Sequence, residues 1–379
     1  MRDTRQETST TFKTTMIPFK RLASFAAFCM VLTCPGRVAA LGIAPSLSSL
    51  RSTLPSERRQ RHHTLLALVT TDSHGSATSS TTTARSRACP HLIYTHLEVN
   101  GMLWQIPATQ NLSLLIDPIA GQLDFGIAPL YTARKKYLTE QSQFYNLIAQ
   151  AAPTHVLLTQ GLDDHTHLPT LRELVKRHAH LHFIIPASAE KKVWGTLPHD
   201  RVTVLRHGET FHLNDQARVT ATVGSLVGPP WQERENGYLL ELSSLQDSND
   251  DDKETTTSSC TIYYEPHGDT SPDLLRRNGV RADVCILPVT QQSLPAPLPA
   301  QVQFPLVHGA ARMRAIVETL GAHTVVPLGN GDLDTAGPLA QLVTSSGTVE
   351  EFAASLAPSS NVQVPRPTPG QALTIDLTR

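Results

Sequence analysis

One segment of the chain, residues 155–171, constrains its fold more than any other. An apolar run from Val156 to Leu158 is followed by a turn that contains glycine and then by residues at helical spacing. This order predicts a buried strand, a loop and a helix. Four polar residues lie in the loop: Asp163, Asp164, His165 and His167. Because α/β proteins usually carry their chemistry at the carboxyl ends of buried strands, the segment predicts an α/β fold and the position of a site, but not a substrate.

The elements around this segment predict two sheets. In the first part, strands are expected at 91–97, 101–107, 112–116, 156–158, 182–186 and 202–205, and helices at 141–152, 169–178 and 188–194. Four strands without intervening helices follow at 209–213, 217–221, 238–242 and 261–265. The remaining pattern predicts helices at 272–278, 310–320, 338–343 and 349–356, with strands at 284–289 and 324–327. Strands that alternate with helices form a covered sheet, and a second run of strands indicates a second sheet. The whole fits a four-layer α-β-β-α sandwich.

The first 88 residues have the composition of a targeting leader. A basic start, an apolar run from Leu22 to Thr33 and small residues at Val38–Ala40 predict a signal peptide over residues 1–40. The apolar run is too short to be a stable membrane span. Residues 41–88 are rich in Ser, Thr and Arg, which is typical of a transit peptide. The two-part layout resembles the plastid leaders of algae with secondary plastids, so we expect plastid import, with secretion as the alternative, and a folded domain over residues 89–379.

Charge also separates the leader from the rest of the chain. Twelve of the 32 Lys and Arg residues, but four of the 33 Asp and Glu residues, lie in the first 91 positions. The remaining 20 basic and 29 acidic residues make the body acidic, which argues against nucleic acid or an anionic membrane as its main partner. An acidic, Ser- and Thr-rich stretch at 246–259 lacks the Gly and terminal Glu of a calcium loop, so it predicts a solvated insertion.

The loop sequence TQGLDDHTH resembles the signature loop of the metallo-β-lactamase superfamily, T-H-x-H-x-D-H. Thr159, Asp164 and His165 match that pattern, whereas Gln160 and Leu162 stand at its first two His positions. Two further blocks, GPPW…ENGY at 228–238 and YYEPHG at 263–268, are similar to a branch of the superfamily found in cyanobacteria and plant plastids. The resemblance implies the four-layer sandwich over almost all of residues 90–379.

The resemblance also implies a metal centre that is incomplete. The superfamily holds one ion with three His and a second with Asp and two His, and a further Asp bridges them. The first set is lost here, because Gln160, Leu162 and the segment around Ser225 provide no His. The second set retains Asp164 and His165, which we expect to bind one Zn²⁺, Fe²⁺ or Mn²⁺.

The remaining ligands of this set are left open by the sequence. The Gly268–Asp269–Thr270 order nominates Asp269 as the next ligand, while the YYEPHG block nominates His267 or Glu265. Residues 328–332 stand where the last His is expected, so His308 and His167 are candidate substitutes.

Other roles for these residues need no metal. Asp164 could cap the following helix while His165 makes a hydrogen bond within the loop. Asp163 is expected to be a solvated or capping neighbour, and Asp117 either caps a turn or braces the site from beneath.

Two functions from different classes follow from this sequence. The first is a metal-dependent hydrolase in which Asp164 and His165 take part in catalysis and metal-activated water attacks an ester, lactone or phosphoester. The second is a non-catalytic protein of the same fold that binds a small ligand or a protein partner in the plastid. The retained acid and His cluster favours the enzyme, whereas the missing ligands favour the binding protein.

Overall fold

The computed structural model describes residues 91–126, 128–227, 233–243, 259–293, 305–356 and 361–378. The expected leader, the GPPW block and nearly all of the 246–259 insertion lie outside the described residues. The boundaries proposed for the leader and the domain therefore stay predictions.

The first sheet has seven strands in the order β18-β1-β2-β3-β5-β6-β7. Their bounds are β1 (His91–His96), β2 (Met102–Ile106), β3 (Leu112–Ile116), β5 (His155–Leu157), β6 (His182–Pro186), β7 (Val202–Leu205) and β18 (Ala372–Asp376). Strands β18 to β3 pair antiparallel, while β3, β5, β6 and β7 pair parallel. The parallel part places the ends of β3 and β5 at the same edge of the sheet, which is where the loop after β5 begins.

The second sheet has six strands in the order β15-β12-β11-β10-β9-β8. They are β8 (Thr210–Asn214), β9 (Ala217–Val223), β10 (Asn236–Ser243), β11 (Ser259–Tyr264), β12 (Val284–Pro288) and β15 (Thr324–Leu328). Strands β8 to β11 pair antiparallel, and β11, β12 and β15 pair parallel.

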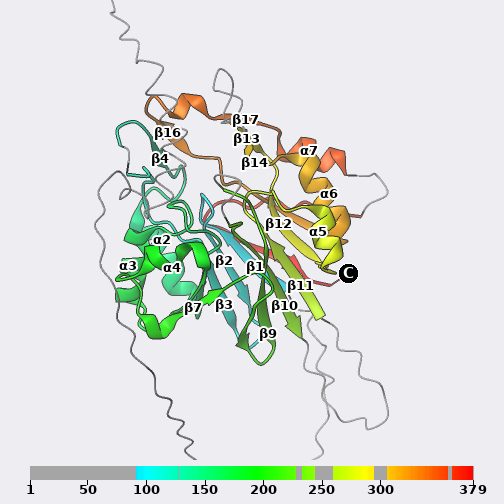
Figure 1. The fold of residues 1–379 in the computed structure, drawn as a ribbon, viewed down its shortest axis with the longest axis horizontal. Coiled ribbons are helices and arrows are strands. Elements are labelled where there is room, and N and C mark those ends of the chain that lie inside the picture. The colour runs from blue at the N-terminus through cyan, green and yellow to red at the C-terminus, as the bar shows by residue number, and fades with distance from the viewer. Residues whose placement is uncertain are drawn as a thin grey trace, which may run out of the picture. The chain divides into compact units, whose positions relative to one another are not determined.

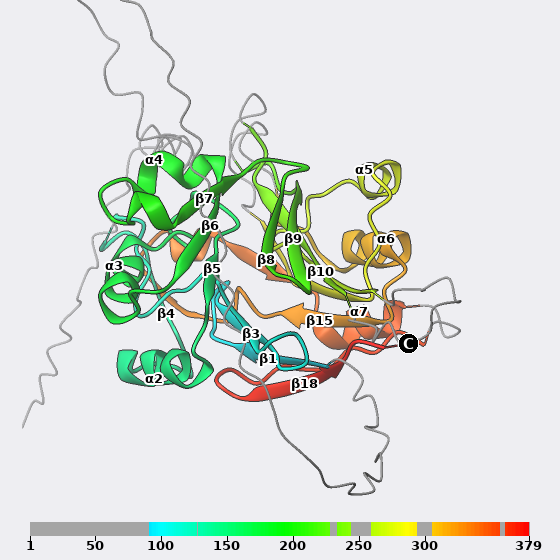
Figure 2. The same cartoon turned by 90° about the horizontal axis from the view of Figure 1, so that it is seen from below.

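Helices cover the outer face of each sheet. The first sheet packs against α2 (Gln141–Ala151), α3 (Leu168–Arg177) and α4 (Glu190–Val193), and the second against α5 (Pro272–Arg277), α6 (Ala310–Leu320) and α7 (Val349–Ser355) (Figures 1 and 2). Side chains alternate between the two faces of each strand. On β2, Trp104 packs between the sheets, and its neighbour Leu103 packs beneath the helices. The predicted α-β-β-α sandwich is confirmed.

Several short elements differ from the sequence-based expectation. Strands β4 (Thr132–Arg134) and β16 (Asp334–Ala336) form a two-stranded sheet, and β13 (Gln291–Ser293), β14 (Pro305–Val307) and β17 (Thr344–Ser346) form a three-stranded one. The helix expected at 338–343 is a single 3₁₀ turn, Ala340–Leu342. These elements are short and mostly exposed, so hydrophobic periodicity does not mark them. No described helix has the length and apolar character needed to cross a membrane.

Candidate metal centre

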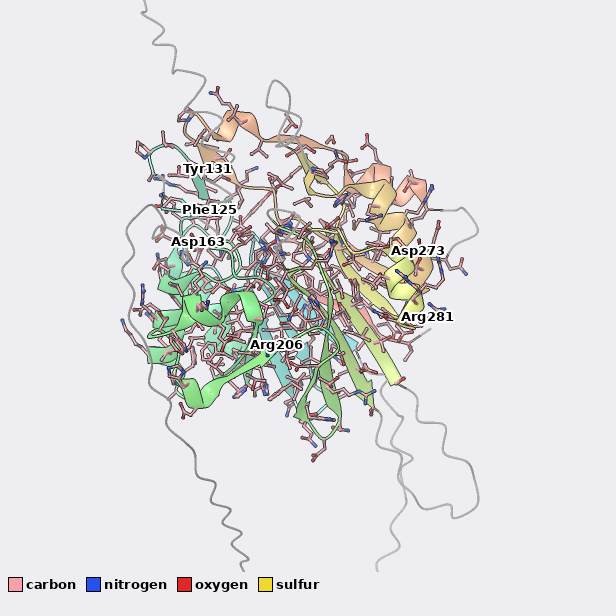
Figure 3. The ribbon with its side chains drawn as sticks, in the orientation of Figure 1. Phe125, Tyr131, Asp163, Arg206, Asp273 and Arg281 are labelled. Carbon is pink, nitrogen blue, oxygen red and sulfur yellow. The ribbon has the colours of Figure 1, made fainter. Side chains whose placement is uncertain are left out.

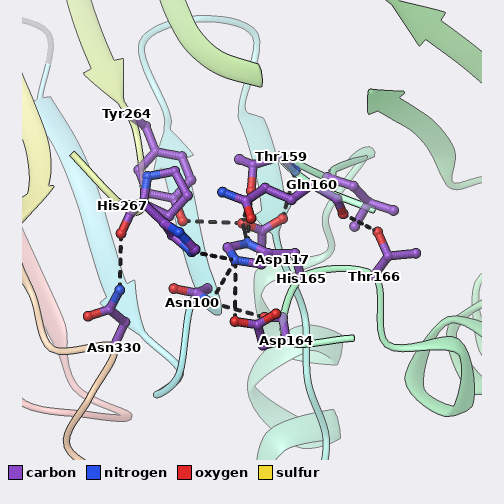
Figure 4. Close-up of polar contacts among 12 residues, drawn as sticks. Asn100, Asp117, Thr159, Gln160, Asp164, His165, Thr166, Tyr264, His267 and Asn330 are labelled. Carbon is purple, nitrogen blue, oxygen red and sulfur yellow. Dashed lines mark hydrogen bonds and ion pairs between the residues drawn. The ribbon is translucent and has the colours of Figure 1, made fainter. Parts of the chain in front are cut away.

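The candidate site lies where strands of the two sheets end. Asp117 follows β3, the segment 159–165 follows β5, and residues 265–267 follow β11. Figure 4 shows that these three segments bring a ring of polar side chains together.

Asp117 holds one of the candidate ligands in place. Its carboxylate is fully buried and accepts hydrogen bonds from the Thr159 backbone N–H (2.8 Å) and hydroxyl (2.6 Å), from His165 Nδ1 (2.9 Å) and from the Tyr264 hydroxyl (3.2 Å). Because a carboxylate can only accept, His165 carries its hydrogen on Nδ1, and the lone pair of Nε2 faces the site. Asp117 therefore braces the site from beneath.

Asp164, His165 and His267 form the group suited to a metal ion. One ligand atom from each lies within 4.8 Å of the other two. The Nε2 atoms of His165 and His267 are 3.3 Å apart, and Asp164 Oδ2 lies 3.6 Å from His165 Nε2. The other Asp164 oxygen, Oδ1, is buried without a hydrogen-bond partner.

This geometry fits one divalent ion. Two imidazole nitrogens bound tetrahedrally to Zn²⁺, each about 2.0–2.1 Å from it, are separated by about 3.3–3.4 Å. The observed separation of the two Nε2 atoms is 3.3 Å. Two His and one carboxylate form a donor set that also suits Fe²⁺ and Mn²⁺. The unpartnered Asp164 oxygen also fits a cation, because buried polar atoms normally have a partner.

His165 and His267 differ in how tightly they hold a proton. Burial, and to a smaller extent the neighbouring His165, lower the pKa of His267 to about 4. Burial also disfavours the charged form of His165, but the Asp164 and Asp117 carboxylates outweigh it and raise its pKa. His267 therefore presents a neutral imidazole at neutral pH, whereas an ion binding to His165 must compete with a proton.

Asn100 is a member of the site that the sequence did not reveal. It follows two residues with left-handed backbone in the β1–β2 turn, Glu98 (φ 62°) and Val99 (φ 55°). Its side-chain Nδ2 donates to the Asp164 carbonyl oxygen (3.1 Å) and lies 3.1 Å from His165 Nε2. An ion bound at Nε2 would displace this amide. The Asn–Gly pair in a hairpin was the available signal, but it indicated only a turn.

The structure separates the alternatives left open near His267. Glu265 is fully buried, burial raises its pKa, and its Oε1 accepts from the Ser225 hydroxyl (2.5 Å) and the His267 N–H (3.2 Å). Asp269 instead pairs with Arg234 (2.6 Å) and with His308 Nε2 (3.0 Å). His267 is thus the residue that completes the candidate metal-binding group with Asp164 and His165, while Asp269 and His308 are paired with each other.

Other residues singled out by the sequence lie around this centre. His167, not Asp164, is the N-cap residue of α3, and its Nδ1 lies 2.7 Å from the Thr170 hydroxyl. Asp163 is partly exposed and forms an ion pair with Lys192 (2.5 Å); its position is labelled in Figure 3. Asn330, in the segment where a last His was expected, donates from its side chain to the Pro266 carbonyl oxygen (3.0 Å).

Comparison with known proteins identifies the class of protein. A family model described as the β-lactamase superfamily domain matches residues 95–329, which is more than half of the chain. The chain belongs to this superfamily of metallo-β-lactamase-fold hydrolases. No curated protein matches the chain.

Solved structures with similarity to the chain include three from prokaryotes. A metallo hydrolase from the archaeon Ignicoccus hospitalis is 12% identical with a TM-score of 0.49, and 76% of this chain and 100% of that chain are covered. The metallo-β-lactamase fold protein YhfI from Bacillus subtilis is 12% identical with a TM-score of 0.45, at coverages of 76% and 100%. A putative metal-dependent hydrolase from Parabacteroides distasonis is 15% identical with a TM-score of 0.43, at coverages of 73% and 93%.

Proposed function

We propose that this protein is a hydrolase that uses one divalent ion held by Asp164, His165 and His267, and that its substrate is an ester, a lactone or a phosphoester. The observation that carries the proposal is the 3.3 Å separation of the two Nε2 atoms, with the Asp164 carboxylate beside them. A divalent ion bound there would supply Lewis-acid activation of water and of the substrate's polar bond.

The chain's own residues would prepare this chemistry. Asp117 fixes the His165 tautomer, so that the Nε2 lone pair is available. Burial keeps His267 neutral, which leaves its Nε2 lone pair available too. Asp164 adds a negative charge to the donor set, and its side chain is 21% exposed, so solvent reaches the centre from that side.

A binding protein without catalysis is the second candidate. It is favoured by Asn100, whose amide already occupies the hydrogen-bonding position at His165 Nε2. The two candidates differ in whether the chain binds a metal ion.

Metal content of the full chain tests the proposal. We expect about one ion per chain by plasma mass spectrometry after supplementation with Zn²⁺, Fe²⁺ or Mn²⁺, and loss of that ion in an Asp164→Ala, His165→Ala double variant. A matched control is the exposed neighbouring pair His199 and Asp200, whose double Ala variant should keep the ion. Absence of metal from well-folded wild-type protein, or retention of it in the first variant, would favour the binding protein.

We also propose that residues 1–88 direct the chain to a plastid. The support is the sequence itself, an apolar signal-like run followed by a segment rich in Ser, Thr and Arg. A fluorescent protein fused after residue 88 should enter the plastid of a diatom, and removal of residues 41–88 should redirect it to the secretory route. Secretion of the complete fusion would refute plastid import.

A further inference from the structure

In the part of the chain that the structure describes, several carboxylates lie around the candidate metal centre, and the cations found beside them are paired. Asp117 and Asp164 lie against His165, at 2.9 Å and 3.6 Å. Glu265 accepts a hydrogen bond from the His267 backbone. Of the cationic side chains that the structure describes, Arg234 pairs with Asp269 and Lys192 pairs with Asp163, while the buried Lys135 donates to the Leu97 carbonyl oxygen.

A charge balance follows for the loaded site. The two positive charges of one divalent ion match the two carboxylates that contact His165, Asp117 and Asp164. Among the described residues at the centre, no positive charge then remains for a phosphoester, which carries about one or two negative charges and is normally bound by Arg, Lys or further metal ions.

A second, independent observation comes from Gln160. Its side chain is fully buried, and neither the amide nitrogen nor the amide oxygen has a hydrogen-bond partner. Its backbone is held firmly, since the Thr166 hydroxyl donates to the Gln160 carbonyl and the preceding Thr159 is bound to Asp117. Figure 4 draws the Gln160 side chain among the residues of the centre. A buried amide without a partner has an N–H free to donate, and an uncharged carbonyl oxygen suits the role of acceptor.

We propose that the reacting group of the substrate is an uncharged carboxylic acid derivative, an ester or lactone, whose carbonyl oxygen accepts a hydrogen bond from Gln160, and not a phosphoester. This inference rests on the hydrolase proposed above. In the reaction, the oxygen of water bonds to the carbonyl carbon, and the bond between that carbon and the alkoxy oxygen breaks. One proton of the water passes to the alcohol, and the other remains on the carboxylic acid or goes to solvent.

Direct binding to the metal-loaded full chain tests the substrate class. The probes are δ-valerolactam, an uncharged lactone analogue that hydrolyses slowly, and inorganic phosphate, each titrated calorimetrically. We expect the lactam to bind at least about ten times more tightly than phosphate, because only phosphate brings uncompensated charge to the centre. Hydrolysis of p-nitrophenyl acetate should likewise exceed that of bis(p-nitrophenyl) phosphate.

The role of Gln160 is tested by variants that remove its polar atoms. Gln160→Leu should weaken lactam binding by about tenfold, the effect of one lost hydrogen bond, and should leave the metal stoichiometry unchanged. If the Leu variant fails to fold, Gln160→Met, which keeps the unbranched shape of Gln, is used in its place. Gln143→Leu on the exposed face of α2 is the matched control and should change neither quantity.

The outcomes distinguish this inference from the function on which it rests. Phosphate binding as tight as that of the lactam, no lactam binding, or unchanged lactam binding in the folded Gln160 variants would overturn the inference while metal binding persists. A wild-type chain that holds no metal would instead refute the hydrolase, and with it the basis of the inference.

Discussion

At the scale of single residues, Asp117 determines most of the geometry of the site. One buried carboxylate receives hydrogen bonds from Thr159 and His165 in the loop after β5 and from Tyr264 in β11. These bonds set the His165 tautomer and hold the start of the loop that carries Asp164. A single substitution there should therefore affect both stability and metal affinity.

We expect Asp117→Asn to destabilise the fold by about 2–4 kcal/mol, because an amide N–H would face donors that the carboxylate now satisfies. Metal affinity should fall by about 10–100-fold, since the Nδ1 partner of His165 is weakened. Urea unfolding and metal titration measure the two effects. Asp273→Asn is the control, because the Asp273 side chain is 76% exposed. Wild-type values for both quantities in Asp117→Asn would contradict the bracing role.

Glu235 gives the fold a pH dependence. The residue is 2% exposed, and burial raises the pKa of its carboxyl from 4.5 to about 7, although a hydrogen bond from Ser188 opposes the shift. The folded state thus holds the proton more tightly than the unfolded state does. The resulting stability is fully present below pH 4.5 and is lost as the pH rises to about 7.

Glu235→Gln should remove this contribution. Between pH 4.5 and about pH 8, the stability of the wild type should fall relative to that of the variant by on the order of 3 kcal/mol. The comparison uses urea unfolding of both proteins in the presence of a chelator, so that metal binding does not contribute. Parallel stability profiles for the two proteins would show that the pKa of Glu235 is the same in the folded and unfolded states.

The sequence could nominate Asp164 and His165 because a short motif fixes their positions relative to one strand end. It could not nominate Asn100, which reaches Asp164 across 64 positions of the chain. The same holds for the choice between Glu265, His267 and Asp269. Each follows β11 within a few residues, and only the packing of His308 and Arg234 shows that Asp269 is paired elsewhere.

At the scale of elements, the loop after β5 rests on the turn that begins α4. The Gly161 N–H donates to the Ser188 hydroxyl (3.0 Å), and that hydroxyl donates to Glu235. A methyl group on Gly161 would lie 2.7 Å from the Ser188 carbonyl oxygen, so only glycine allows this approach. The position of the ligand loop therefore depends on contact with a neighbouring element.

Gly161→Ala should push the loop away from Ser188 and lower metal affinity by at least about tenfold, with a stability cost of about 1–3 kcal/mol. Metal titration and urea unfolding measure these changes. Gly329→Ala is the control, because a methyl group there meets a single atom, His96 Nε2, at 3.6 Å. If Gly161→Ala binds metal as the wild type does, the loop position does not depend on this contact.

Helices were predictable because their apolar residues follow a regular period, and buried strands because their apolar residues form a continuous run, as in β12, where all five residues are buried. Strands such as β16 and β17 are three residues long and fully exposed, so no apolar pattern marks them. Strand β18 was missed for a related reason. One of its five residues is buried, and its place is set by pairing with β1 at the other end of the chain.

At the scale of the whole molecule, the candidate centre joins the two sheets. Asp164 and His165 follow β5 of the first sheet, whereas His267 follows β11 of the second. An ion shared by these residues would link the two sheets at one edge of the core between them, and it would stabilise the folded state because the unfolded chain has no such site.

Removal of metal should therefore lower the melting temperature. At a free metal concentration 100 times the Kd, binding adds about 2.7 kcal/mol to the free energy of unfolding. Calorimetry with a chelator, and then with metal restored, should show a reversible shift in wild-type protein and none in His267→Ala. Equal melting temperatures with and without metal in the wild type would mean that no ion links the sheets.

The pairing of β18 with β1 also has a consequence in time. The first strand of the described fold is completed about 280 residues before the strand that covers its outer edge. At translation rates of about 5–20 residues per second, β18 is synthesised roughly 15 to 55 seconds after β1. During that interval the unpaired backbone groups of β1 can bind another nascent chain or a chaperone. Newly made molecules are thus most prone to aggregate before β18 pairs with β1.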